Sequence, residues 1–536
     1  MMMTRHWKVL LLLFILGAGL CYVTTRIQTV PGYMDAEYYY SISKQIISGN
    51  GWTEPFLWNY IDSPLGLPHQ ANTYWMPLVS FIAAASMWLA GNVSFSSSRW
   101  IFVALAGLVP VITYTINFRL TQNEILAKFA GLFSLFSGFY LIYLSLTDSF
   151  LIYMLLGSLT IIIVSDFYDQ RSREGLWKGK KLFLIGLLTG LMHLTRADGI
   201  TWFLVILLGE IFYLFKDIGK KSVKSQLLSI VFLIFGYFSV TAFWYLRNWF
   251  EFHSLSVPGS SSMIWLTSYN QTFSFLPLEI NIQNWLAAGI GNYWNAVWNA
   301  IKMNLANMLA VQGSIFLIAF IAIGIWVFRK NRLIKFTCFA WGMNFIVMTF
   351  VFPFAGARGG FLHTGAATQL IFWALIPIGL EQIILWGKEY RNWNDPKALK
   401  SFGYLFLCLA FLFTSVVYLN NVIGDGDFQS PGWEQSTQKM QVISNYLKSQ
   451  DVDQQDVVMI NNPPGYYYVS EGLSVVIPDN DPAILFEAVK KYQVKVVVLE
   501  ENHPGSLDDL YSGVEKPDWL KLMGMVEDAR IYEVID

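Results

Sequence analysis

The chain has 536 residues, of which 54% are hydrophobic and only 14% are charged. Soluble domains carry about 25% charged residues, so this composition excludes an ordinary soluble protein and is typical of a chain that crosses a bilayer several times. The 36 basic residues almost balance the 37 acidic ones, which argues against a nucleic-acid-binding surface.

A helix that crosses the apolar core of a bilayer needs about 20 predominantly apolar residues. The first such segment, 9–25, lies between Lys8 and Arg26, and we interpret it as a retained membrane helix rather than a cleaved signal. The other candidates are 100–118, 129–146, 151–165, 182–197, 200–215, 226–246, 308–328, 336–353, 366–386 and 401–420. The sequence therefore predicts an α-helical polytopic membrane protein with about eleven transmembrane helices.

Short basic loops orient these helices, because Lys and Arg concentrate on the cytoplasmic side. Such loops lie at 171–181, 216–224, 329–335 and 388–400. They predict a protein of the cytoplasmic (plasma) membrane with its N-terminus inside and its C-terminal domain outside. The apolar segment 74–90 would reverse this orientation if it crossed, so we expect it to lie on the outer face as an interfacial or re-entrant helix.

Two long outer loops are predicted, at about 26–99 and 247–307. Both are rich in Trp, Tyr and apolar residues, so we expect them to fold onto the membrane rather than to be disordered. The inner loops are short, which places any chemistry on the outer side.

The chain divides into a membrane domain, 1–420, and a soluble extracytoplasmic domain, 421–536. Short buried strands alternate with helices in the second part, which predicts a small α/β domain. The expected strands are 456–460, 473–477, 494–499 and 531–534, and the expected helices are 435–449 and 482–492. The segment Asn462–Tyr468 has two interpretations, a surface that presents aromatic rings to a sugar or a turn followed by packed tyrosines.

Three acidic residues lie at the predicted outer interface. Asp35 and Glu37 follow the first span, and Asp148 lies in a turn between two spans. Paired carboxylates at such a place can activate a hydroxyl or hold a metal ion. They can also favour a helix N-terminus or cap it.

Three arginines, Arg196, Arg247 and Arg358, lie on the same outer side, where arginine should be scarce. Isolated arginines at the ends of spans can simply extend to the interface. Three together can instead bind a phosphate, for which the guanidinium fork is well suited.

These motifs resemble those of the GT-C glycosyltransferases, in particular the branch of protein O-mannosyltransferases, aminoarabinose transferases and the RgtA/B/C/D-like group. The likeness covers roughly residues 1–420. The stretches that carry it are the first apolar helix, Asp35-Ala36-Glu37, Asp148, His193-Leu194-Thr195-Arg196-Ala197-Asp198-Gly199 and Tyr245-Leu246-Arg247-Asn248. The stretch His69–Leu78 departs from the family's Lys/His-Pro-Pro pattern, which puts a role for His69 in doubt.

The resemblance implies a glycosyltransferase that takes a sugar from a polyprenyl phosphate and transfers it, with inversion, to a glycan, lipid or protein acceptor. Asp35 is then the expected base, with Glu37 or Asp148 assisting it or holding a divalent metal ion; the cofactor itself stays open. Phosphate contacts are expected from Arg196, Arg247, Arg358 and His363. Sugar or acceptor contacts are expected from Tyr38, Tyr39, His69 and Trp75.

Two other classes of protein remain open. A flippase or transporter of lipid-linked sugars would also need charged groups, but it would often show repeated halves, and no convincing repeat is present. A non-catalytic membrane scaffold for the C-terminal domain would not need acids and arginines gathered on one side.

Overall fold

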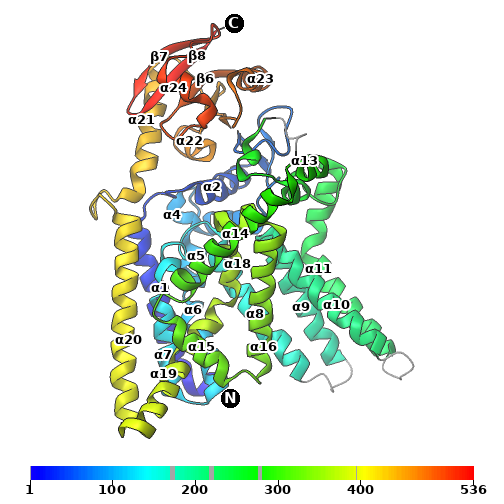
Figure 1. The fold of residues 1–536 in the computed structure, drawn as a ribbon, viewed down its shortest axis with the longest axis vertical. Coiled ribbons are helices and arrows are strands. Elements are labelled where there is room, and N and C mark those ends of the chain that lie inside the picture. Colours follow the sequence, from blue (N-terminus) through cyan, green and yellow to red (C-terminus); the bar gives the residue numbers. More distant parts are fainter. Residues whose placement is uncertain (1, 170–175, 217–222, 276–279, 394, 536) are drawn as a thin grey trace.

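The structure is a computed structural model that describes residues 2–169, 176–216, 223–275, 280–393 and 395–535. Parts of the basic loops 171–181 and 216–224 lie outside these residues. The protein is 71% helical, and a small C-terminal sheet stands on one end of a bundle of long helices (Figure 1). The N-terminus lies at the opposite end of that bundle (Figure 1).

Within the described residues, eight helices are long and apolar enough to cross a membrane. Five of them are α1 (Met2–Ile27), α4 to α6 (Phe95–Thr121), α8 (Ser149–Asp169), α11 (Val223–Phe252) and α17 to α19 (Pro353–Arg391). The other three are helices extended by an adjoining turn: α10 (Ile200–Lys216) within Ala197–Lys216, α16 (Arg332–Ile346) within Arg332–Val351, and α20 (Asp395–Tyr418), whose crossing segment is Lys397–Ile423. A further helix, α9 (Leu176–Thr195), packs along α11. The predicted fold class, a polytopic helical membrane protein with a small C-terminal sheet, is confirmed.

The predicted span 129–146 is interrupted. Only α7 (Glu124–Leu135) is regular, and its 12 residues reach about 18 Å. The interruption centres on Gly138, whose φ is +58° and whose N–H donates to Thr414 Oγ1 of α20 at 3.1 Å. The chain after this break therefore turns across the end of the bundle and carries Asp148 with it.

The predicted span 308–328 is also interrupted. It begins with a single wide turn at 308–312, which follows directly on α14 (Gly289–Asn307), and only its second part forms a regular helix, α15 (Ile318–Val327). Ser314 and Ile315 both have positive φ angles between these helices, which an unbroken helix cannot accommodate.

The apolar segment 74–90 forms α3 (Leu78–Ala90), which packs against α2 (Met34–Ile47). Its 13 residues span about 20 Å, less than the roughly 30 Å apolar core of a bilayer. Helix α2 lies across the end of the bundle, beneath the C-terminal part of the chain (Figure 1).

The C-terminal part contains the expected helices α21 (Gln435–Ser449) and α23 (Pro482–Tyr492). The expected strands are present as β4 (Val457–Ile460), β5 (Ser474–Val476), β6 (Val494–Leu499) and β8 (Ala529–Val534). Strand β7 (Leu520–Val526) and helices α22 (Pro463–Ser470) and α24 (Asp508–Ser512) were not predicted. The segment 462–468 is thus the start of a helix, and Tyr466 and Tyr467 are buried.

The sheet takes one edge strand from the first long loop. Its order is β2-β5-β4-β6-β8-β7, where β2 is Phe56–Leu57 and pairs in parallel with β5. Leu57 is buried in the same apolar cluster as Val475 and Leu485. The two-stranded pair of β1 (Thr53–Glu54) and β3 (His69–Gln70) lies in the same loop. The division at residue 421 stays a prediction, and the sheet itself joins both parts of the chain.

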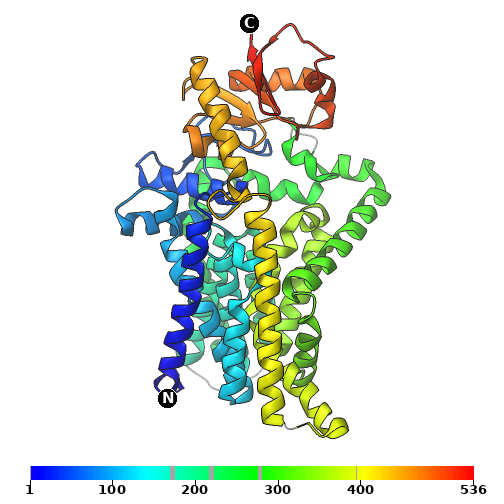
Figure 2. The same ribbon diagram turned by 90° about the vertical axis from the view of Figure 1, so that its left-hand side faces the viewer.

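Figure 2 shows the same arrangement from the side, with the C-terminal sheet and α21 above the long helices and the short helices of the first loop between them. The first long loop therefore lies at the level between the membrane helices and the C-terminal part.

Candidate functional site

Three side chains from distant parts of the sequence meet at the end of the bundle beneath the C-terminal sheet. Asp35 lies in the first turn of α2, Asp148 directly precedes α8, and His363 comes from α18 (Phe361–Gly365). One ligand atom of each lies within 4.8 Å of the others. We call these three residues the acid cluster.

The acid cluster is held by local contacts. The Tyr33 hydroxyl donates a hydrogen bond to Asp148. The His363 ring stacks on Phe150 with 3.8 Å between centroids, and its Nδ1 lies 3.1 Å from Ser149 Oγ. The same nitrogen is 3.7 Å from Asp148 Oδ1. Both partners of His363 lie in the first turn of α8, so this helix fixes the imidazole beside the carboxylate.

The two carboxyl groups perturb each other. Burial and then the charge of Asp148 raise the pKa of Asp35 to about 8, while Arg196 acts in the opposite direction. Burial also raises the pKa of Asp148, against the hydrogen bond from Tyr33. Two neighbouring carboxyls in little water ionise together with difficulty, so the pair is suited to hold a proton or a cation.

Arg196 is the predicted arginine that lies next to the acid cluster. It follows α9, and its Nε donates to Asp198 Oδ1 at 2.9 Å. The Tyr153 hydroxyl donates to the other oxygen of Asp198 at 2.9 Å, and the Arg196 guanidinium lies over the Tyr153 ring at 5.9 Å. Asp198 therefore holds Arg196 in a fixed orientation at the site.

Arg358 lies at the margin of the site. It is exposed, and its guanidinium lies 4.9 Å from the centroid of the Tyr269 ring. Burial and then the charge of Asp35 raise the pKa of Tyr269, and Arg358 acts against this shift. Tyr269 of the second long loop thus contacts Arg358 and is close enough to Asp35 to be affected by its charge.

The structure places two other predicted residues away from the acid cluster. Arg247 donates to the Ala71 carbonyl at 2.6 Å, and its guanidinium lies 4.8 Å from the Trp52 ring centroid. Glu37 is buried on the opposite side of α2, where it accepts a hydrogen bond from Asn462 Nδ2 at 2.8 Å. Arg247 therefore contacts the first long loop, and Glu37 contacts the C-terminal part.

Of the predicted sugar contacts, Tyr39 has the acid cluster as its neighbour. Burial and then the charges of Asp148 and Asp35 raise its pKa. The Trp75 ring packs on Trp58 with 4.3 Å between centroids. Trp75 is half-buried and so has more surface open to a sugar than Tyr39, which is buried.

Tyr38 and His69 belong to a second buried group in the first long loop. Tyr38 donates to Glu54, and His69 lies between Glu54 and Asp62, with each carboxylate 3.4 Å from one ring nitrogen. Burial raises the pKa of Glu54 to about 7. This group connects α2 to β1 and β3.

The acid cluster has the chemistry of a divalent metal site. Two carboxylate oxygens and an imidazole nitrogen converge, and such mixed donors suit zinc or manganese better than calcium. Burial raises the pKa of both carboxyl groups, and the charge of Asp148 raises that of Asp35 further, so positive charge at this place would be stabilising. The metal predicted at Asp35, Glu37 and Asp148 would therefore have His363, rather than Glu37, as its third ligand.

Sequence reasoning missed Tyr33, Asp198 and Tyr269. Tyr33 is two residues from Asp35 and Asp198 is two residues from Arg196, so proximity to a candidate was the available signal. Nothing in the sequence distinguishes Tyr269 from the other 26 tyrosines, because its role depends on how the second loop folds back.

The sequence matches no protein-family model and no curated protein. Solved structures do match. The Archaeoglobus fulgidus oligosaccharyltransferase AglB, in complex with an inhibitory peptide and a dolichol-phosphate, aligns with a TM-score of 0.54 and 12% identity over 92% of this chain and 69% of that one. The A. fulgidus oligosaccharyltransferase in complex with Zn and sulfate gives a TM-score of 0.55 and 13% identity over 93% and 69%.

This chain shares the fold of the A. fulgidus oligosaccharyltransferase, which is a GT-C membrane glycosyltransferase. ArnT from Cupriavidus metallidurans in the apo state aligns over 99% of this chain and 98% of that one, with a TM-score of 0.47 and 12% identity. The predicted resemblance is therefore confirmed at the level of the fold.

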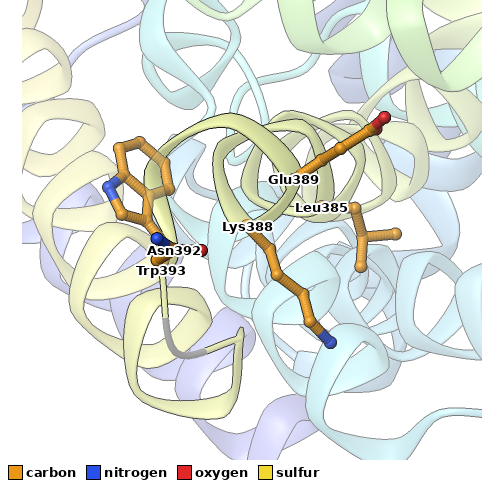
Figure 3. A pocket seen from close by; sticks show the side chains of 5 residues that line it. All are labelled: Leu385, Lys388, Glu389, Asn392 and Trp393. Atoms are coloured by element: carbon orange, nitrogen blue, oxygen red, sulfur yellow. The ribbon is translucent and has the colours of Figure 1, made fainter.

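A surface depression lies at the C-terminal end of α19 (Figure 3). Its lining comes from the last turns of α19 (Gln369–Arg391) and the residues after it: Leu385, Lys388, Glu389, Asn392 and Trp393. The length of α19, about 35 Å, separates it from the acid cluster, so it is no part of that site.

Proposed function

We propose that this protein is a membrane glycosyltransferase that moves a sugar from a polyprenyl-phosphate donor to an acceptor hydroxyl on the extracytoplasmic side of the cytoplasmic membrane. The observation that carries the proposal is the acid cluster with Arg196 beside it, at the end of the membrane helices and beneath the C-terminal part. A lipid-anchored phosphate at the membrane interface would reach this level without leaving the bilayer.

In the proposed reaction, the acceptor oxygen attacks the anomeric carbon as Asp35 takes its proton. The new bond joins the acceptor oxygen to the sugar, and the bond between that carbon and the phosphate oxygen breaks. The polyprenyl phosphate leaves with the electron pair, and the anomeric centre inverts. The place of Asp35 supports this role, because its carboxyl lies in the acid cluster, close enough to Arg196 to be affected by its charge.

Arg196 is proposed to bind the donor phosphate and to stabilise the charge that grows on it as the bond breaks. Asp198 and Tyr153 pre-orient the guanidinium, so little reorganisation would be needed. Arg358 would add a second contact from the exposed margin. Asp35, Asp148 and His363 would hold a divalent metal ion, which would supply further positive charge; a carboxylate that binds a metal through one oxygen keeps the second oxygen for a proton.

The fold of AglB supports a lipid phosphate as the donor, since that protein was solved with a dolichol-phosphate. The sugar and the acceptor are not specified by the residues at the site. We propose a hexose or pentose and a hydroxyl of a glycan, lipid or protein of the cell envelope.

The test uses the purified protein in lipid vesicles supplied with radiolabelled polyprenyl-phosphate sugars and envelope acceptors. We expect label to pass to an acceptor in the parent protein and transfer to fall by about 10²–10⁴-fold in Asp35→Asn, which keeps the side-chain shape but removes the base. Glu389→Gln, at the far end of α19, is the matched control and should transfer normally. Movement of the intact lipid-linked sugar between leaflets, without transfer, would show a flippase instead.

A further inference from the structure

The first turn of α2 presents two carboxyl groups to opposite sides. Residues two positions apart on a helix point about 200° from each other. Asp35 accordingly points to Asp148 and His363, the other two residues of the acid cluster. Glu37 points to the C-terminal part, where its Oε2 lies 2.8 Å from Asn462 Nδ2. Glu37 is 1% exposed, so this hydrogen bond satisfies a carboxyl that has little access to water.

Asn462 is itself held in place. Its Oδ1 accepts a hydrogen bond from Gly465 N at 3.2 Å and so caps α22, which leaves its NH₂ group directed at Glu37. A Cβ at Gly465 would lie 2.4 Å from Asn462 Nδ2 and 3.0 Å from Glu37 Oε2. A side chain at this position would therefore displace the Asn462 amide or the Glu37 carboxyl from their hydrogen bond.

The other side of the same turn is also fixed. The Thr147 hydroxyl donates to the Ala36 carbonyl at 2.8 Å, and Thr147 directly precedes Asp148. Residues 36 and 37 are therefore held between the loop that carries Asp148 and the C-terminal part. Asp35 is the preceding residue in this turn, so its distance from Asp148 depends on both attachments.

We propose that Asn462 is a positioning residue that, through its hydrogen bond to Glu37, sets the place of Asp35 in the acid cluster. The proposal rests on the proposed function, in which Asp35 is the base. The C-terminal part thereby becomes a component of the active site although it supplies no group to the reaction. A displacement of about 1 Å at a reacting group can cost 10²-fold in rate, so one hydrogen bond at this place has a measurable effect.

The test exchanges the donor and the acceptor of this hydrogen bond. Asn462→Asp keeps an oxygen for the α22 cap but places an acceptor opposite Glu37. We expect kcat to fall tenfold or more while the donor KM stays within twofold of the parent value. Adding Glu37→Gln restores a donor on the other side of the pair, so the double variant should recover most of the lost kcat.

Glu471→Gln is the matched control. It removes the 2.5 Å contact between Lys44 and Glu471, which joins the far end of α2 to the end of α22, and it should leave kcat unchanged. A double variant that stays as slow as Asn462→Asp, or an Asn462→Asp variant with the parent kcat, would overturn the proposal.

Hydrogen exchange of the backbone amides in residues 34–40 gives a second readout that does not need activity. Exchange should rise in Asn462→Asp, return in the double variant and stay at the parent level in Glu471→Gln. If the parent protein transfers no sugar, the proposed function fails, and unchanged exchange in Asn462→Asp would separately show that Asn462 does not hold this turn.

Discussion

At the scale of single residues, Arg196 and Arg247 look alike in the sequence but have different partners in the fold. Arg196 is oriented by Asp198 beside the acid cluster, whereas Arg247 donates to a backbone carbonyl of the first long loop. A guanidinium that donates to a backbone carbonyl stabilises the structure of that loop. A guanidinium beside two acidic side chains can bind a substrate.

Substitution by alanine should separate these roles. A charge-assisted contact is worth about 1.5–3 kcal/mol, so Arg196→Ala should raise the donor KM roughly tenfold or more, with a normal melting temperature. Arg247→Ala should lower the apparent melting temperature and leave the donor KM near the parent value. Steady-state transfer assays and thermal unfolding in detergent measure the two quantities. The opposite pattern would assign the phosphate to Arg247.

The Glu54 and His69 group predicts how stability depends on pH. Burial raises the folded-state pKa of Glu54 from 4.5 to about 7, and the neighbouring carboxylates of Asp62 and Glu54 raise the pKa of His69 against its burial. Both groups bind protons more tightly in the folded protein, so their stabilising contribution is complete below pH 4.5 and decreases as the pH rises through about 7.

The apparent melting temperature should therefore fall by several degrees between pH 5 and pH 8. Glu54→Gln, which has no proton to lose, should show a smaller decline than the parent protein over the same interval. Equal slopes in the two proteins would mean that Glu54 is already ionised in the folded state.

The sequence predicted part of the site for a clear physical reason. Asp35, Asp148 and Arg196 are charged groups at the ends of apolar spans. Burying a charge near the membrane costs free energy, so such residues stand out in the sequence. The sequence predicts His363 as a phosphate contact together with the arginines. It does not reveal that His363 lies beside Asp148, because that distance depends on the turn at α18. The alternate faces of α2 separate Asp35 from Glu37, and this could be foreseen only if residues 34–47 were known to be helical.

At the scale of helices, α9 and α11 cross at two glycines. A Cβ on Gly186 would lie 2.1 Å from the Leu233 carbonyl oxygen, and one on Gly236 would lie 2.0 Å from the Phe183 carbonyl oxygen. Small residues of this kind let membrane helices approach closely enough to pack backbone on backbone. Arg196 directly follows α9, so this crossing also fixes the height of the arginine at the site.

Gly236→Ala should force the two helices apart. Extra atoms in a well-packed contact cost about 1–3 kcal/mol, so we expect a lower apparent melting temperature together with a higher donor KM. Gly342→Ala in α16 is the matched control, because a Cβ there meets no atom within 4 Å. Comparable melting temperatures for the two variants would show that the α9–α11 contact tolerates the added methyl group.

The sequence predicted helices and strands correctly where the pattern that defines them is local. The bounds of α21 and α23 agree with the predicted 435–449 and 482–492. The breaks in 129–146 and 308–328 were missed, since an apolar run has no periodic signal for a positive φ. Strand β2 was missed because its two residues form a strand only through their pairing with β5.

At the scale of the whole molecule, the proposed chemistry depends on orientation. The N-terminus and the C-terminal part lie at opposite ends of the membrane helices (Figure 1). A reporter that is active only outside the cytoplasm should work when fused to the C-terminus, and it should fail when fused within 388–400. The reversed result would place the acid cluster in the cytoplasm and exclude an extracytoplasmic donor.

The pairing of the first long loop with the C-terminal sheet also has a consequence for how the protein is made. Tyr60 donates to the Val476 carbonyl, although the two residues are 416 apart in sequence. During synthesis, β2 therefore reaches its side of the membrane long before its partner strand β5 has been made. Until then its edge is unpaired and can pair with other chains. The same late event that closes this edge brings Asn462 to α2. Quality control at the membrane and the onset of activity would then respond to one event, the arrival of residues 457–476.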